Sequence, residues 1–217
     1  MKIETIVCGS INTNSYILYD EKNLEGVIID PAEGKPIMSF MERNSLRIKA
    51  ILLTHGHYDH IEGIPYIIEK ASDIPIYIDK NDEDCLTNPE WNGSFNTGNP
   101  VSVDNVKEVL DYNDELKLGN FHFNVFSFPG HTPGSVVLKY DNILFSGDFI
   151  FKGSVGRTNY FRGSHKSMIE SLKRFVDIFS KIDSDLHIFP GHMESTKLSY
   201  ELQHNPFLVR IINNSNE

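Results

Sequence analysis

The sequence contains a dense group of residues that can bind metal ions. His55, His57, Asp59 and His60 stand within six positions, directly after an apolar run. Residues i and i+2 of an extended segment project to the same side, so His55 and His57 can approach one ion together, and Gly56 lets the backbone bend between them. Asp59 and His60 come one turn later and can face a neighbouring ion. Imidazole and carboxylate groups bind zinc or iron in open hydrolytic sites, so this segment predicts a metal site.

Three further candidate ligands follow other expected strands. His131 lies in the turn Pro129-Gly130-His131-Thr132-Pro133-Gly134, Asp148 ends Phe145-Ser146-Gly147-Asp148, and His192 ends Phe189-Pro190-Gly191-His192. A single loop histidine is usually only a solvated side chain. Three ligand-type residues at strand ends, in addition to the first group, indicate a cavity that collects its ligands from several loops.

The order of these residues resembles that of a known family. Thr54-His55-Gly56-His57-Tyr58-Asp59-His60, followed by His131, Asp148 and His192, is similar to the metallo-β-lactamase-fold hydrolases over nearly the whole chain. The resemblance implies an α/β fold, the αββα four-layer sandwich, with two metal ions at one edge. It implies that His55, His57 and His131 bind the first metal, that Asp59, His60 and His192 bind the second, and that Asp148 bridges them.

Two segments favour one branch of this family. The segment from Ser146 to Thr158, together with Pro129 to Ser135, is similar to short glyoxalase II-like (hydroxyacylglutathione hydrolase-like) proteins. True lactamases of the fold carry Cys or Ser at the position of Asp148. The longer glyoxalase II enzymes add a C-terminal helical region that grips glutathione. Only about 25 residues follow His192, so we expect that region to be absent or vestigial.

The resemblance implies hydrolysis of a thioester such as an S-acylglutathione. A metal-bridging hydroxide, oriented by Asp59 as catalytic residue, would attack the carbonyl, and the thiolate would leave without a dedicated general acid. We expect two divalent ions, zinc for preference, although iron or manganese accept the same ligands. Arg157, Tyr160 and Lys152 are candidate substrate-binding residues, and Met193-Glu194 stand where the family often has Gly-Pro.

Other functions remain open at this stage. A persulfide dioxygenase of the same fold would use one iron, and a hydrolase of another small ester or thioester would share the site. A tRNA-processing nuclease of this fold is disfavoured by the acidic charge, since binding the nucleic-acid backbone needs basic surface. A binding protein with a decayed site is disfavoured because every expected ligand position is filled.

Composition sets the outer limits. The 217 residues carry 20 Lys plus Arg against 30 Asp plus Glu, a formal charge of −10, and suit one domain spanning 1–217. The longest apolar runs fall short of the ~20 residues that a membrane span needs, and the N-terminus does not resemble a signal peptide. Cys8 and Cys85 are expected to be free thiols. We therefore expect a cytoplasmic protein with a small-molecule thioester or ester substrate, no nucleic-acid or membrane partner, and an undetermined oligomeric state.

Hydrophobic patterns predict the elements that must position these residues. A helix capped by Ser164 is expected from His165 to about Phe179, after a loop from Gly153 to Gly163, and the tail from Thr196 is expected to be helical and then frayed. The segment from Asn81 to Asn105 is expected to hold a helix fragment and a long surface loop. The other expected helices are Pro36–Asn44 and Ile61–Lys70. The expected strands are Lys2–Val7, Ser15–Tyr19, Val27–Ile29, Ile48–Leu53, Ile74–Ile78, Phe121–Phe128, Val136–Tyr140, Ile143–Phe145 and a last one at Leu186–Phe189.

Overall fold

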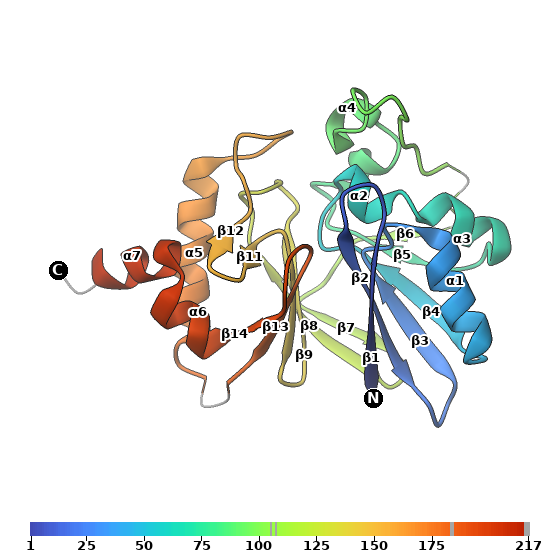
Figure 1. Cartoon of the computed structure of the whole chain (residues 1–217), viewed down its shortest axis with the longest axis horizontal. Coiled ribbons are helices and arrows are strands. Elements are labelled where there is room, and N and C mark those ends of the chain that lie inside the picture. Colours follow the sequence, from blue (N-terminus) through green and yellow to red (C-terminus); the bar gives the residue numbers. More distant parts are fainter. Residues whose placement is uncertain (105, 107, 183–184, 215–217) are drawn as a thin grey trace. The chain divides into compact units, whose positions relative to one another are not determined.

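The computed structural model describes residues 1–104, 106, 108–182 and 185–214. The chain divides into two compact units, Met1–Tyr112 and Asn113–Glu217. In Figure 1 the first unit runs from blue to green and the second from yellow-green to red. Each unit contains one six-stranded sheet and its own helices, so each has its own α and β layer.

The sheet of the first unit has the strand order β1-β2-β3-β4-β5-β6. The first three strands are antiparallel, and β3 to β6 run parallel to one another. Every residue of β2 from Thr13 to Tyr19 is buried, as is most of β3, which is the pattern of strands covered on both faces. The bounds are β1 Lys2–Cys8, β2 Thr13–Asp20, β3 Glu25–Ile29, β4 Arg47–Leu52, β5 Ile76–Tyr77 and β6 Val109–Leu110.

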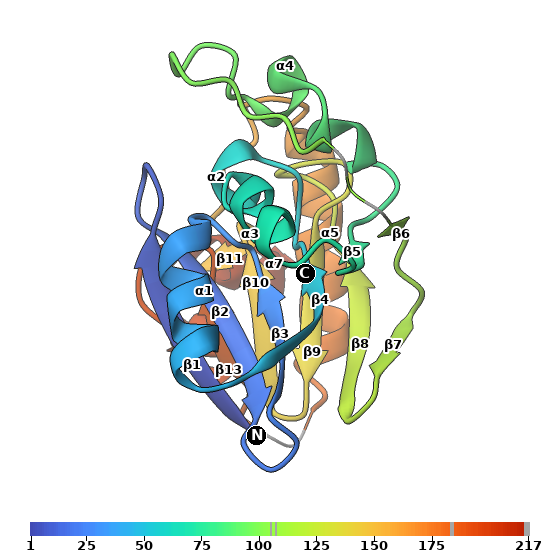
Figure 2. The same ribbon diagram turned by 90° about the vertical axis from the view of Figure 1, so that its right-hand side faces the viewer.

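Two helices, α1 (Gly34–Arg43) and α3 (Ile64–Lys70), pack on this sheet. Ile37 and Met41 of α1 lie four positions apart, on one face of the helix, and both are buried in the core of the unit. Figure 2 looks onto this face, with both helices in front of the strands. The short helix α2 (Tyr58–Ile61) carries part of the predicted metal motif.

The sheet of the second unit has the order β14-β13-β10-β9-β8-β7. The strands β7 to β10 are antiparallel neighbours, whereas β10 and β13 run parallel. The strand predicted at Phe121–Phe128 is confirmed as β8, in which Phe121, Phe123 and Val125 are buried while His122 and Asn124 are exposed. The bounds are β7 Glu115–Leu118, β8 Phe121–Ser127, β9 Val136–Tyr140, β10 Ile143–Gly147, β13 His187–Pro190 and β14 Thr196–Lys197; β11 Ile150–Phe151 and β12 Ser154–Val155 form a separate hairpin.

The main helix of the second unit, α5 (His165–Phe179), has the predicted bounds. The hydroxyl of Ser164 accepts a hydrogen bond from the amide of Ser167 at 3.2 Å, which confirms the predicted cap. The rings of Phe175 and Phe179 contact that of Phe128 edge-on and at a tilt, in a core that also holds residues of α7. The last helices are α6 (Leu198–His204) and α7 (Pro206–Asn214). The predicted fraying beyond Asn214 lies outside the described residues.

Several predicted elements differ from the structure. The expected helix Ile61–Lys70 is divided, because the Gly63 amide bonds the Pro31 carbonyl at 2.8 Å and breaks the run between α2 and α3. The strand expected at Ile74–Ile78 contains only Ile76–Tyr77, since Pro75 has no amide to donate. Leu186–Phe189 is not the last strand, because β14 pairs with β13.

Two further expected segments contain short ordered elements. The Gly153–Gly163 loop begins with β12. In the Asn81–Asn105 segment the expected helix fragment is confirmed as α4 (Pro89–Asn92), and the 3-10 turn η1 (Glu83–Leu86) precedes it. Asn105 lies outside the described residues.

Both cysteines are free, as predicted, with Cys8 half-buried and Cys85 buried. Among the described helices, none has the length and apolar character required to cross a membrane.

Candidate metal centre

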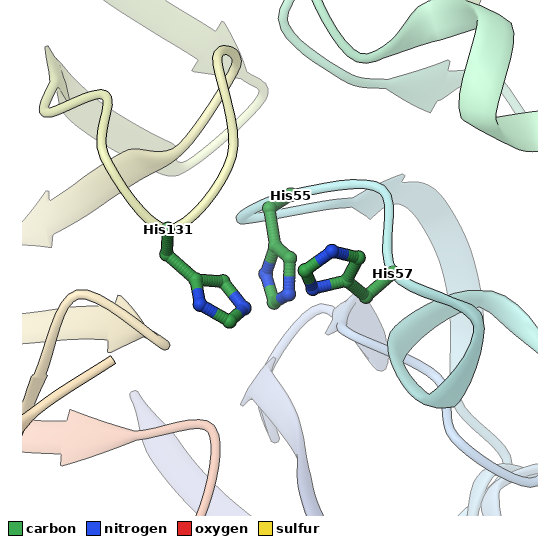
Figure 3. Close-up of side chains that lie close together, drawn as sticks. All are labelled: His55, His57 and His131. Carbon is green, nitrogen blue, oxygen red and sulfur yellow. The ribbon is translucent and has the colours of Figure 1, made fainter. Parts of the chain in front are cut away.

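The metal-binding motif of the first unit lies in the loop that leaves β4 and enters α2. His55, His57, Asp59 and His60 are all buried. The ring centroids of His55 and His57 are 4.9 Å apart and their planes are almost perpendicular, and those of His55 and His60 are 4.1 Å apart. Figure 3 shows the first two rings side by side on this loop. The motif therefore gathers three imidazoles and a carboxylate, as its spacing predicts.

Asp30 orients this group from the neighbouring strand end. It is buried directly after β3 with φ of 50°, a left-handed conformation that costs energy for a residue with a side chain. Its carboxylate accepts hydrogen bonds from the amide and hydroxyl of Thr54, at 2.8 and 2.6 Å. The same carboxylate lies 3.0 Å from Nδ1 of His60. A carboxylate beside Nδ1 favours the proton on that nitrogen and leaves Nε2 as the metal ligand, so we expect Asp30 to orient His60.

Sequence reasoning did not single out Asp30, which directly follows the expected strand Val27–Ile29. The parallel pairing of β3 with β4 could have identified Asp30, because Ile29 at the end of β3 pairs with Leu52 at the end of β4. An acid directly after that pair has to lie beside the start of the motif.

Thr13 positions Asp59, the carboxylate of the metal-binding motif, through a hydrogen bond. This buried first residue of β2 donates its hydroxyl to Oδ2 of Asp59 at 2.9 Å. The same oxygen lies 3.2 Å from Nε2 of His60. Asp59 is therefore held by a fixed donor on one side and faces an imidazole on the other. Nothing in the sequence singled out Thr13, because only the pairing of β2 brings it near a residue 46 positions later.

The second unit brings together its own three predicted ligands. Oδ2 of Asp148 lies 3.4 Å from Nε2 of His131 and 3.6 Å from Nε2 of His192. The parallel pairing of β10 with β13 puts the ends of these strands side by side, which explains why Asp148 and His192 meet. The carboxylate of Asp148 therefore lies close to both of the other predicted ligands of this unit.

The His131 loop is fixed against α5 and against the loop after β12. A Cβ on Gly130 would lie 2.5 Å from the Cα of Met168, so only glycine allows this approach to the helix. Nδ1 of His131 lies 2.9 Å from the carbonyl oxygen of Arg157. A carbonyl acceptor holds the proton on Nδ1 and directs Nε2 towards a metal. Figure 3 shows the His131 ring on its loop.

The three predicted substrate-binding residues are only partly brought together. The Arg157 guanidinium lies 5.0 Å from the centre of the Tyr160 ring, and its Nε donates to Asn159 at 3.2 Å. Lys152 instead pairs with Glu194 at 2.5 Å, with both side chains exposed. This hydrogen-bonded pairing raises the pKa of Lys152 and lowers that of Glu194.

The donors in the two units fit divalent metal ions. All seven predicted ligands present an imidazole nitrogen or a carboxylate oxygen, the groups that zinc, iron and manganese bind. His60 and His131 also have the outer partners that metal-bound histidines require, Asp30 and the Arg157 carbonyl. The donor set is therefore that of a divalent-metal centre.

Known proteins that are similar to this chain include three that span almost all of it. A family profile described as "Metallo-beta-lactamase superfamily" matches residues 9–192. The "Probable metallo-hydrolase YqgX" of Bacillus subtilis is 32% identical, covering 96% of this chain and 98% of the relative. The "Hydroxyacylglutathione hydrolase GloC" of Haemophilus influenzae is 31% identical, with coverage of 96% and 98%. The crystal structure of the BLEG-1 B3 metallo-beta-lactamase is 35% identical, with a TM-score of 0.87 and coverage of 95% and 99%.

Proposed function

The chain belongs to the metallo-β-lactamase superfamily and has its fold, and from this premise we propose that it hydrolyses small thioesters, such as S-acylglutathiones. The observation that carries the proposal is the complete donor set, in particular Asp148 placed between His131 and His192. The similarity to a relative named hydroxyacylglutathione hydrolase supports the substrate class. The superfamily and the donor set themselves make the chain a metallo-hydrolase.

We assign the ligands by the superfamily pattern. His55, His57 and His131 would hold one divalent ion, and Asp59, His60 and His192 a second, with Asp148 shared between them. Zinc is the ion we expect, because imidazole and carboxylate ligands suit it and because it takes no part in redox chemistry.

Divalent ions in such a site lower the pKa of water towards ~7, polarise a carbonyl and stabilise a leaving thiolate. The residues of this chain supply the orientation. Asp59, held by the Thr13 hydroxyl, can accept a proton from a water molecule and fix its direction. Because a thiolate is a stable leaving group, the site needs no separate acid to protonate it.

The substrate is expected to be a small molecule in the cytoplasm, with no nucleic-acid or membrane partner. The net charge of −10 opposes binding to a polyanion. Arg157, stacked on Tyr160, is the group of this chain that would recognise a substrate carboxylate.

Opening of a β-lactam ring is a second candidate reaction. The specific observation in its favour is the similarity to a protein described as a B3 metallo-beta-lactamase, whereas Asp148, where true lactamases carry Cys or Ser, favours the thioester. Both reactions are attacks of water on an acyl carbon, so the same site could serve either, and the leaving group distinguishes them.

The test uses purified protein loaded with zinc, iron or manganese and analysed for metal by mass spectrometry. Thioester hydrolysis is followed with lactoylglutathione and other acyl thioesters, and lactam hydrolysis with a chromogenic cephalosporin. We expect two ions per chain and thioester turnover that His131→Ala abolishes. A fully loaded protein without turnover of any thioester would contradict the proposal. One iron per chain, with oxygen uptake on a persulfide, would assign the chain to the dioxygenases instead.

A further inference from the structure

The segment between Asp82 and Val103 is held in a fixed structure by internal hydrogen bonds, although its polar composition suggests a surface loop. Three of its polar residues, Asp82, Asn92 and Ser94, are completely buried. Burying polar groups costs free energy unless they are hydrogen-bonded, so such residues mark a structure with fixed internal bonds.

Those bonds tie the segment to itself. The Asn92 amide donates to the carbonyl oxygens of Cys85 and Val101, both at 2.9 Å. The Ser94 hydroxyl accepts from the Val101 amide at 2.7 Å. The two ends of the segment are therefore held together around η1 and α4, which gives η1 a rigid support.

Asp82 connects this segment to the metal motif. Asp82 directly precedes η1, a position at which an aspartate side chain often accepts a hydrogen bond from an amide of the first turn. In this turn, all of which the structure describes, the Asp82 side chain makes no such capping hydrogen bond. Its Oδ2 instead accepts the amide proton of Gly56 at 3.0 Å, across 26 positions of sequence. Gly56 is the residue between His55 and His57, so the carboxylate fixes the backbone that carries both rings.

Cys85 closes the other side of the same contact. A Cβ on Gly56 would lie 2.5 Å from the Cβ of Cys85 and 3.1 Å from the carbonyl oxygen of Asp82. The glycine is therefore pressed against η1 while its amide is bound by Asp82. Such a two-sided contact leaves the peptide between the histidines little freedom to rotate.

We propose that Asp82 is a positioning residue, which holds the His55-Gly56-His57 backbone in its metal-binding conformation before a metal arrives. The inference rests on the proposed function only in taking these two histidines as metal ligands. A preorganised site binds its metal more tightly, because the entropy lost in ordering the ligands is already lost when the protein folds. Loss of an outer partner of this kind typically lowers metal affinity by about 10- to 100-fold.

The experiment compares two substitutions at this position. Asp82→Asn keeps an oxygen acceptor for the Gly56 amide, and we expect it to retain zinc affinity within about threefold. Asp82→Leu keeps the approximate size and removes the acceptor, and we expect the 10- to 100-fold loss, measured by competition between the apo-protein and a chromophoric chelator. Asp20→Leu is the matched control, because Asp20 also accepts a backbone amide, from Lys22 at 2.9 Å in a turn of the first unit.

Hydrogen exchange supplies a readout that does not depend on activity. In the wild-type apo-protein the Gly56 amide should be protected, and Asp82→Leu, but not Asp20→Leu, should speed its exchange. If Asp82→Leu fails to fold, the wild-type measurement decides, since exchange of the Gly56 amide at the rate of an unstructured chain would overturn the proposal. Wild-type zinc affinity in Asp82→Leu would overturn it as well. A protein that binds zinc but hydrolyses no thioester would refute the proposed function and leave this inference standing.

Discussion

The loop after β12 places Gly156 against two predicted metal ligands, Asp148 and His131. A methyl group at Gly156 should therefore displace both ligands from their positions. A Cβ on Gly156 would lie 1.8 Å from the carbonyl oxygen of Asp148 and 3.1 Å from Nδ1 of His131. An ordinary contact requires about 3.4 Å. The chain at Gly156 and Asp148 must therefore move apart by about 1.6 Å, the difference between 3.4 and 1.8 Å.

This displacement is large compared with what a metal site tolerates. Metal–ligand distances hold within about 0.2 Å, so a shift several times larger should lower metal affinity by at least the 10- to 100-fold of an outer-partner mutation. Overpacking of this kind also costs about 1–3 kcal/mol of folding stability. We therefore expect Gly156→Ala to unfold at a lower temperature and to lose metal on gel filtration.

Gly153→Ala separates these two effects. Within the described chain a Cβ on Gly153 meets no atom closer than 4 Å, but its φ of 69° strains any side-chain-bearing residue by about 1–2 kcal/mol. Both variants should thus lose similar stability by calorimetry, while only Gly156→Ala loses metal, as measured by mass spectrometry and chelator competition. Full metal affinity in Gly156→Ala would refute the reasoning that this glycine sets the positions of Asp148 and His131.

Three further predictions follow from single contacts. Thr13→Val removes the hydroxyl donor of Asp59 and should cost about 1–3 kcal/mol in urea denaturation, whereas Thr13→Ser should restore most of it; equal stability of the two variants would contradict a role for the hydroxyl. Met193 is exposed at φ of 68°, so Met193→Gly should raise the free energy of unfolding by up to about 1 kcal/mol, and a loss would show that this strain is absent. Burial raises the pKa of Tyr16 and Tyr112 above that of a free tyrosine, so above pH ~10 the unfolded chain loses these protons and the folded chain keeps them. Stability should therefore fall as pH rises through this range, by up to about 1.4 kcal/mol per pH unit for each tyrosine, and Tyr112→Phe should reduce the slope.

Much of the fold could be predicted because its signals are local. The period of apolar residues and the cap at Ser164 predicted the bounds of α5, and the hydrophobic pattern from Phe121 predicted β8. The misplaced elements are those whose ends depend on partners distant in sequence. The break between α2 and α3 requires the Pro31 carbonyl to meet Gly63, and β14 exists only through its pairing with β13.

The sequence by itself determined which residues are the candidate donors, because imidazole and carboxylate groups at fixed spacing after strands are a chemical pattern that needs no coordinates. It could not reveal what orients them. Asp30, Thr13 and Asp82 act on residues 24 to 46 positions away, through strand pairing and a folded-back segment. Hydrogen bonds depend on distance and angle, so only the tertiary structure decides which polar residue near a strand end faces a ligand and which faces water.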